Sequence, residues 1–309
     1  MMAVLPGRGG KVGAPESTIA AKGNLSFNDD NNKAPVGAER SPRALGYLKS
    51  LPINVGNMVK MAAAGTIPPL VALLGPQSSA EVQRIAVMAL KNLSISADNQ
   101  VTMASAGAIP PLVALLGPRS SAGMQEAAAW ALANLSANAG NKVKVAAAGA
   151  IPFLVALLGP QSSSGVKEAA AGALGNLSLN VKNMLRISAA GAIPLLVALL
   201  GPWSTMGGQV AAAMALTNLA TNADNKVNIA AAGAIPPLVA LLGPQSPAEV
   251  QEAAARALRS LSFNFDNNAK IRSAGCKSAL DPLIQSHHPS LRAVASSLMK
   301  MLEWDTSME

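Results

Sequence analysis

Asparagine is the residue whose type and spacing most suggest a binding role in this 309-residue chain. One asparagine recurs every 42 residues in near-copies of the segment "AAAWALANLSANAGNK". The copies place it at Asn92, Asn134, Asn176 and Asn218, and the series stops at Ser260. A primary amide both donates and accepts hydrogen bonds, so it can pair with a peptide unit whatever side chain that unit carries. The question is whether these amides bind a peptide backbone or only shape the chain.

Two other series keep the same period and predict the elements that carry these amides. Asparagines at 57, 99, 141, 183, 225 and 267 each begin a short run such as "NKVKVAAAG", which suits the N-cap of a first helix. Glycines at 65, 107, 149, 191, 233 and 275 end that helix, and "AIPPLVALLG" follows as a second helix with proline near its start. Gly-Pro stops the second helix, and Ser78 with Glu81, or Ser246 with Glu249, forms a capping box for a third.

The chain is therefore predicted to be all-α, an α-solenoid of about six three-helix repeats of 42 residues. At 100° per residue, Glu126 and Trp130 lie on the same side of the third helix as Asn134, which points away from the core. Ala127 lies on that side too, and its small side chain, like those of Ala169, Ala211 and Ala253, would let a ligand approach.

Composition fits one elongated domain rather than several globular ones. Hydrophobic residues make up 50% of the chain and aromatic residues only 3%, which suits closely packed aliphatic helices. The single cysteine, Cys276, occupies a position where other repeats carry alanine, so it is predicted to be a small buried residue and no disulfide framework is possible. Apolar runs are interrupted by glycine and proline, so no direct membrane insertion is expected. The N-terminus has no apolar signal core, and we expect a cytoplasmic protein, with the nucleus as the alternative.

The net charge of +8 does not predict nucleic-acid binding. Residues 1–56 and 141–182 contribute +3 each, and no basic stripe or stacking aromatic series runs along the repeats. No nucleotide-binding glycine motif or catalytic triad pattern is present, so no enzyme, no small-molecule substrate and no cofactor are expected. His287 and His288 are adjacent without metal-ligand spacing, and we predict no metal site.

The wording of the repeat, for example "NLATNADNKVNIAAAGAIPPLVALL", resembles armadillo repeats. It is most similar to the arrays of plant U-box proteins and of the yeast vacuolar armadillo protein, over about residues 45–281. The resemblance implies a right-handed superhelix whose third helices line a concave groove, where an asparagine ladder hydrogen-bonds the backbone of an extended peptide. It implies this role for a groove formed by Asn92, Asn134, Asn176, Asn218, Trp130, Glu126, Glu168, Met88, Met214 and Arg256.

Trp130 with Asn134 also resembles the Trp-x-x-x-Asn pair with which nuclear-import adaptors grip basic signals. The equivalent positions are Met88, Gly172, Met214 and Arg256, so only one repeat has the pair, and import of classical basic cargo is not predicted. Trp130 could be an isolated aromatic anchor for a partner or could fill space between repeats.

The two ends of the array depart from the period. The segment "GNLSFNDDNNK" at 23–33 ends like a third helix, yet 16 residues are missing before the next unit. We therefore expect residues 1–44 to be an eroded repeat and a disordered segment, either by genuine loss or because the gene model is mis-spliced or truncated. The repeat domain is expected over 45–304, with a more polar terminal cap at its end and a tail over 305–309.

The leading prediction is a non-enzymatic scaffold that binds an extended segment of a partner protein in the third-helix groove. One alternative is the substrate-recruiting subunit or a fragment of a ubiquitin ligase, although no U-box is recognisable before the repeats. Another is a tether to a membrane or organelle that acts through a membrane-bound partner.

Overall fold

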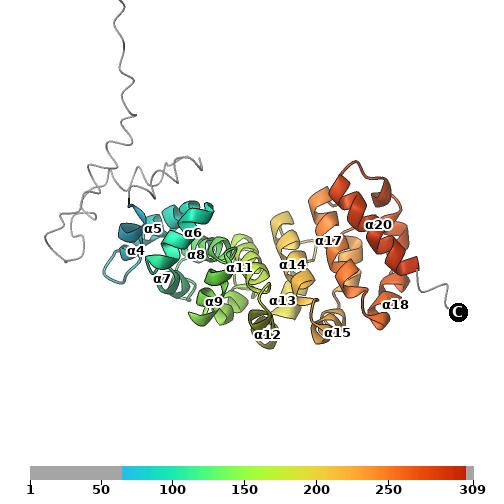
Figure 1. Ribbon diagram of the computed structural model, residues 1–309, viewed down its shortest axis with the longest axis horizontal. Coiled ribbons are helices and arrows are strands. Elements are labelled where there is room, and N and C mark those ends of the chain that lie inside the picture. The colour runs from blue at the N-terminus through green and yellow to red at the C-terminus, as the bar shows by residue number, and fades with distance from the viewer. Residues whose placement is uncertain (1–64, 304–309) are drawn as a thin grey trace, which may run out of the picture.

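The computed structural model describes residues 65–303 as an elongated stack of helices that runs from α4 at one end to α20 at the other (Figure 1). Seventeen α-helices and one 3-10 helix, with no strand, make up these described residues. The predicted all-α solenoid of three-helix repeats is thus confirmed. The expectations for residues 1–44 and 305–309 lie outside the described residues.

The first helix of each repeat begins three residues earlier than predicted. These helices are α6 (Ala97–Ser105), α9 (Ala139–Ala147), α12 (Val181–Ala189), α15 (Ala223–Ala231) and α18 (Phe265–Ser273). Their N-caps are Ser96, Asn138, Asn180, Asn222 and Asn264, and each of the four asparagines accepts a backbone N–H with its side chain. The prediction that Asn141 and its equivalents are the caps is therefore wrong.

Asn141 and its equivalents have a different structural role, inside the stack. They are 2 to 4% exposed in the five described first helices. The side-chain nitrogens of Asn141, Asn183 and Asn267 donate to the carbonyls of Gln100, Lys142 and Lys226, each on the first helix of the preceding repeat. Asn99 and Asn225 donate instead to carbonyls at the end of the third helix just before them. These buried amides join consecutive helices and repeats.

The cap assignment has a testable consequence at Asn222, which accepts a hydrogen bond of 3.0 Å from the backbone nitrogen of Asn225. Asn222→Ala leaves that N–H without its partner and is expected to lower the free energy of unfolding by about 1 kcal/mol in urea denaturation. Asn228→Ala, an exposed site on the same helix, is the matched control and should change it by less than about 0.5 kcal/mol. Equal effects at the two sites would contradict the cap.

The second helices are short because glycine and proline bound them. They are α4 (Ile67–Ala72), α7 (Ile109–Ala114), α10 (Ala150–Leu157), α13 (Ala192–Ala198), α16 (Ile235–Ala240) and α19 (Cys276–Leu280). The glycine before each one has φ between 75° and 82°, a left-handed conformation that glycine adopts without strain. Beyond the helix, the side-chain nitrogen of Gln83 donates to the carbonyl of Gly75 at 2.8 Å, and Gln125, Gln209 and Gln251 repeat this bond.

The third helices are the longest helices of each repeat, and the stack is built around them. They are α5 (Ala80–Leu93), α8 (Ala122–Leu135), α11 (Ser164–Leu177), α14 (Met206–Leu219), α17 (Ala248–Leu261) and α20 (Pro289–Glu303), the last preceded by the 3-10 helix η2 (Leu283–Gln285). Consecutive third helices pack side by side from α5 to α20.

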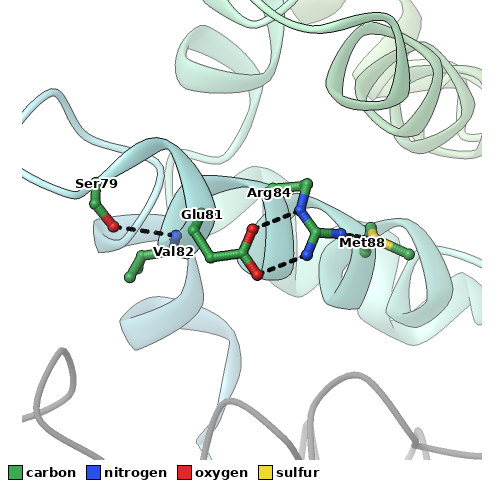
Figure 2. Close-up of polar contacts among 5 residues, drawn as sticks. All are labelled: Ser79, Glu81, Val82, Arg84 and Met88. Carbon is green, nitrogen blue, oxygen red and sulfur yellow. Dashed lines mark hydrogen bonds and ion pairs between the residues drawn. The ribbon is translucent and has the colours of Figure 1, made fainter. Parts of the chain in front are cut away.

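The predicted capping boxes of the third helices are displaced by one residue. Ser79, not Ser78, caps α5 and accepts from the backbone nitrogen of Val82, while Glu81 pairs with Arg84 on the next turn (Figure 2). In α17 the cap position is Pro247, which offers no side-chain acceptor. These two third helices therefore start one residue later than predicted, and Glu81 forms an ion pair with Arg84.

A single aliphatic core runs through the described repeats, from Ile67 to Leu302. Ala127, Ala169 and Ala253 belong to it and are at most 5% exposed, and Ala211 packs against it. The prediction that these alanines leave room for a ligand is therefore wrong, since they lie inside the stack.

In residues 65–303 no single helix is long and apolar enough to cross a membrane. Two pairs of consecutive helices together have the length and composition of a membrane span, but each pair is bent: α9 and α10 by 84°, and α12 and α13 by 79°.

Cys276 is fully buried at the start of α19, as its alanine equivalents predict. Burial raises the pKa of its thiol to about 12, so almost no thiolate exists at neutral pH. We expect iodoacetamide to leave Cys276 unmodified in the native protein and to alkylate it readily in urea, as measured by mass spectrometry. Alkylation at the same rate in both states would contradict the burial.

Candidate functional site

The predicted groove residues lie on one side of the third helices, in rows one turn apart. We call this surface the third-helix stripe and define it by three rows in α5, α8, α11, α14 and α17. The asparagine row is Asn92, Asn134, Asn176, Asn218 and Ser260; the middle row is Met88, Trp130, Gly172, Met214 and Arg256; the first row is Arg84, Glu126, Glu168, Val210 and Glu252. All fifteen positions are half-buried or exposed. The stripe is therefore accessible along five repeats.

The asparagine row is tied to the preceding repeat by its amide nitrogens. Asn176 donates to the carbonyl of Ala133 at 2.8 Å, and Asn218 donates to the carbonyl of Gly175 at 2.9 Å. Asn134 reaches the equivalent carbonyl of Lys91 through a hydroxyl, since it donates to Ser94 Oγ at 2.9 Å and Ser94 donates onward to Lys91. Each bond links the C-terminal ends of two neighbouring third helices.

This pattern changes what the amides can offer a ligand. Sequence reasoning expected both donor and acceptor to face a partner, but one N–H of Asn134, Asn176 and Asn218 is used between repeats. Within residues 65–303 the Oδ1 atoms of these three side chains accept no hydrogen bond. The row is thus a series of half-exposed carbonyl acceptors, held in fixed orientation by the bonds behind them.

Trp130 has a packing role that the sequence left open. Its Cζ3 atom lies 3.6 Å from the place where a Cβ on Gly172 would be, one repeat further along the same row. The indole therefore covers the position where Gly172 has no side chain, and it packs against the core. Because Trp130 is only half-buried, part of its side chain stays accessible on the stripe.

The carboxylates of the first row lie at the starts of the following third helices. Glu126 Oε2 comes so close to Gly165, in the first turn of α11, that a Cβ there would lie 2.5 Å away. Glu168 lies closer still to Gly207 in α14 and accepts from the hydroxyl of Thr205 at 2.7 Å. Helix N-termini favour nearby negative charge, so both carboxylates stabilise the junction between repeats.

Met88 and Met214 are exposed apolar groups on the stripe, at 40% and 53%. Arg84 lies over the sulfur of Met88 while it pairs with Glu81 (Figure 2). Arg256 is not free either, since it binds Glu252 at 2.6 Å and Ser290 at 3.3 Å. The hydrogen bond from the Ser290 hydroxyl and then that from Arg256 lower the pKa of Glu252. The ionised Glu252 carboxylate therefore stabilises the fold, and this stabilisation is lost as the pH falls through the lowered pKa.

The structure also presents features that sequence reasoning missed. Trp203, in the turn between α13 and α14, is 98% exposed beside a hollow of about 300 Å³ lined by Leu158, Leu195 and Leu199. Its equivalents are Gln77, Arg119, Gln161 and Gln245, so the aromatic residue itself was the signal in the sequence. In the described part of the chain, no three His, Cys, Asp or Glu side chains gather as metal ligands would.

Comparison with known proteins identifies the repeat. The model of the armadillo/beta-catenin-like repeat matches residues 96–137, 138–179 and 222–263. The protein is an armadillo repeat protein. The matched segments agree with the 42-residue period, and each includes the loop, the three helices and the stripe residues of one repeat.

Several solved structures similar to this armadillo array are engineered proteins. One engineered protein is 31% identical, with a TM-score of 0.70, and the match covers 77% of this chain and 98% of that one. A designed armadillo repeat protein is 29% identical, with a TM-score of 0.70 and coverage of 76% and 99%. Another, solved in complex with the peptide (KR)4, is 29% identical, with a TM-score of 0.67 and the same coverage. No curated protein sequence gave a significant match.

Proposed function

We propose that this armadillo protein is a non-enzymatic scaffold that binds an extended segment of a partner protein along the third-helix stripe. The observation that carries the proposal is the asparagine row, in which three Oδ1 acceptors are fixed by inter-repeat bonds and have no partner within residues 65–303. An extended segment has backbone N–H groups that are free to donate to such acceptors.

The rest of the stripe supports the same use. Met88, Met214 and the accessible part of Trp130 supply apolar contacts around the acceptors, and flexible methionine adapts to varied side chains. The designed armadillo protein solved with a peptide has the same fold, which supports a protein partner. Ligase recruitment and membrane tethering are particular uses of such a scaffold and stay predictions.

Site-specific photo-crosslinking tests the proposal and identifies the partner. A benzophenone amino acid is introduced at Met88 or Met214, and in a matched control at Phe153 on α10, which is 40% exposed like Met88 but lies on a second helix. We expect the stripe positions to crosslink one partner segment in cell extract, read by mass spectrometry, while Phe153 does not. Crosslinks to that partner from Phe153 alone would refute the assignment of the stripe.

A further inference from the structure

Most of the large apolar side chains exposed in residues 65–303 lie away from the third-helix stripe. Nine of these fourteen side chains belong to the first helices or to the loops just before them. They are Ile95, Val101, Val143, Leu179, Val181, Leu185, Val227, Phe263 and Phe265. The first helices α9, α12, α15 and α18 follow one another along the lower edge of Figure 1. This edge is therefore a second candidate surface for binding.

Two neighbouring first helices combine apolar and basic residues at the same positions. Val143 and Lys144 on α9 correspond to Leu185 and Arg186 on α12. In the other described first helices this pair is Val101 with Thr102, Val227 with Asn228, and Ala269 with Lys270. Among the described first helices, only α9 and α12 therefore have an exposed large apolar side chain followed by a cation.

The residues form two parallel rows on α12. Val181 and Leu185 are one turn apart, as are Lys182 and Arg186, and all four are exposed, while Ile187 faces the core. On α9, Val143 and Lys144 continue these rows. The two helices lie side by side, because the side chain of Asn183 donates to the carbonyl of Lys142. We call Val143, Lys144, Val181, Lys182, Leu185 and Arg186 the first-helix patch.

The positive charge of this patch forms no ion pairs. None of its three cations is paired within residues 65–303. Glu168 is the one acidic residue between positions 127 and 223, and its carboxylate is at the start of α14, bound to Thr205; the next acidic residue, Asp224, lies on α15. The neighbouring Lys142 adds a further positive charge. The patch therefore favours a ligand that is both acidic and apolar.

We propose that the first-helix patch is a second docking site, which binds an acidic helical segment of a partner protein with a row of apolar side chains beside a row of carboxylates. Such a segment would place its carboxylates on Lys144, Lys182 and Arg186 and its apolar groups on the valines and Leu185. The three apolar side chains are 51 to 66% exposed, so they are half set into the surface. Side chains in this position can contact a protein segment that lies on the surface. Insertion into a membrane would require apolar side chains that project several ångströms further from the protein.

Fluorescence anisotropy with a labelled helical peptide made only of Leu and Glu tests this proposal on the full chain. The double variant Lys144→Thr, Arg186→Asn introduces the residues found at the equivalent positions of α6 (Thr102) and α15 (Asn228). The fold is therefore expected to survive, which circular dichroism checks. We expect binding of the peptide to weaken about tenfold, since two charge contacts are lost. Lys270→Asn, at the same position on α18 beside Ala269, is the control and should leave binding unchanged.

Three results would overturn the proposal. The first is equal binding of the peptide by the native protein and the Lys144→Thr, Arg186→Asn variant. The second is tight binding to vesicles of phosphatidylcholine and phosphatidylserine in equal parts, lost in that variant, without binding of the peptide; this would assign the patch to a membrane surface. The third is loss of peptide binding when Asn134, Asn176 and Asn218 are replaced by alanine, which would locate the peptide on the third-helix stripe. Failure of the stripe proposal leaves this test unaffected.

Discussion

Replacement of Asn134, Asn176 and Asn218 together by alanine is expected to weaken binding of the crosslinked partner segment by between about ten- and a thousandfold. The estimate assumes three lost hydrogen bonds of roughly 0.5 to 1.5 kcal/mol each. Isothermal titration calorimetry with a synthetic peptide of that segment measures the change. The triple variant also loses three bonds between repeats, so its free energy of unfolding should fall as well.

Aspartate at the same three positions separates binding from stability. Aspartate keeps the acceptor oxygens but cannot donate to the preceding repeat, so this variant should lose stability as the alanine variant does and still bind the segment. Affinities are compared at high salt, which screens the added charges. If the alanine variant binds as tightly as the native protein, the asparagine row is not the binding site. If both variants lose affinity equally, the amides act only by holding the repeats together.

The largest effect on stability is expected at Leu174 in the middle of the array. Its side chain is fully buried on α11, which packs between α8 and α14. Leu174→Ala removes apolar contacts and leaves a cavity, so the free energy of unfolding should fall by about 2 to 5 kcal/mol in urea denaturation. In a stack stabilised by contacts between neighbours, damage in a central repeat should also make the transition less cooperative.

Leu179→Ala is the matched control for this prediction. It is the same substitution five residues later, in the loop before α12, where the side chain is 59% exposed. Its effect on the free energy of unfolding should stay below about 0.5 kcal/mol. A loss of similar size in both variants would mean that the helix packing described for α11 is wrong.

The sequence predicted the elements of this protein well because its signals are local and repeated. Glycine with positive φ and the Gly-Pro stop recur every 42 residues, and each fixes a turn by its own backbone chemistry. The caps were assigned less well. Asn138 and Asn141 are both suitable caps, three residues apart, and only the contact of Asn141 with Gln100 on the preceding repeat shows which of them is buried.

The stripe itself could be predicted only in part. A helical wheel places Asn134, Trp130 and Glu126 on one side of α8, and the structure agrees that they are accessible there. A wheel of one helix cannot show contacts with the next repeat, however. The bond from Asn176 to Ala133 spans 43 residues, and the indole of Trp130 covers Gly172 on another helix. Both depend on how neighbouring third helices align, which the single repeat does not encode.

The most direct test of peptide binding by the third-helix stripe is a crystal structure of the protein with the crosslinked partner segment. We predict that backbone nitrogens of the segment lie about 2.7 to 3.2 Å from the Oδ1 atoms of Asn134, Asn176 and Asn218. The bonds from these side chains to the preceding repeat should persist in the complex. A segment bound to the second helices, with the three Oδ1 atoms in contact only with water, would contradict the account.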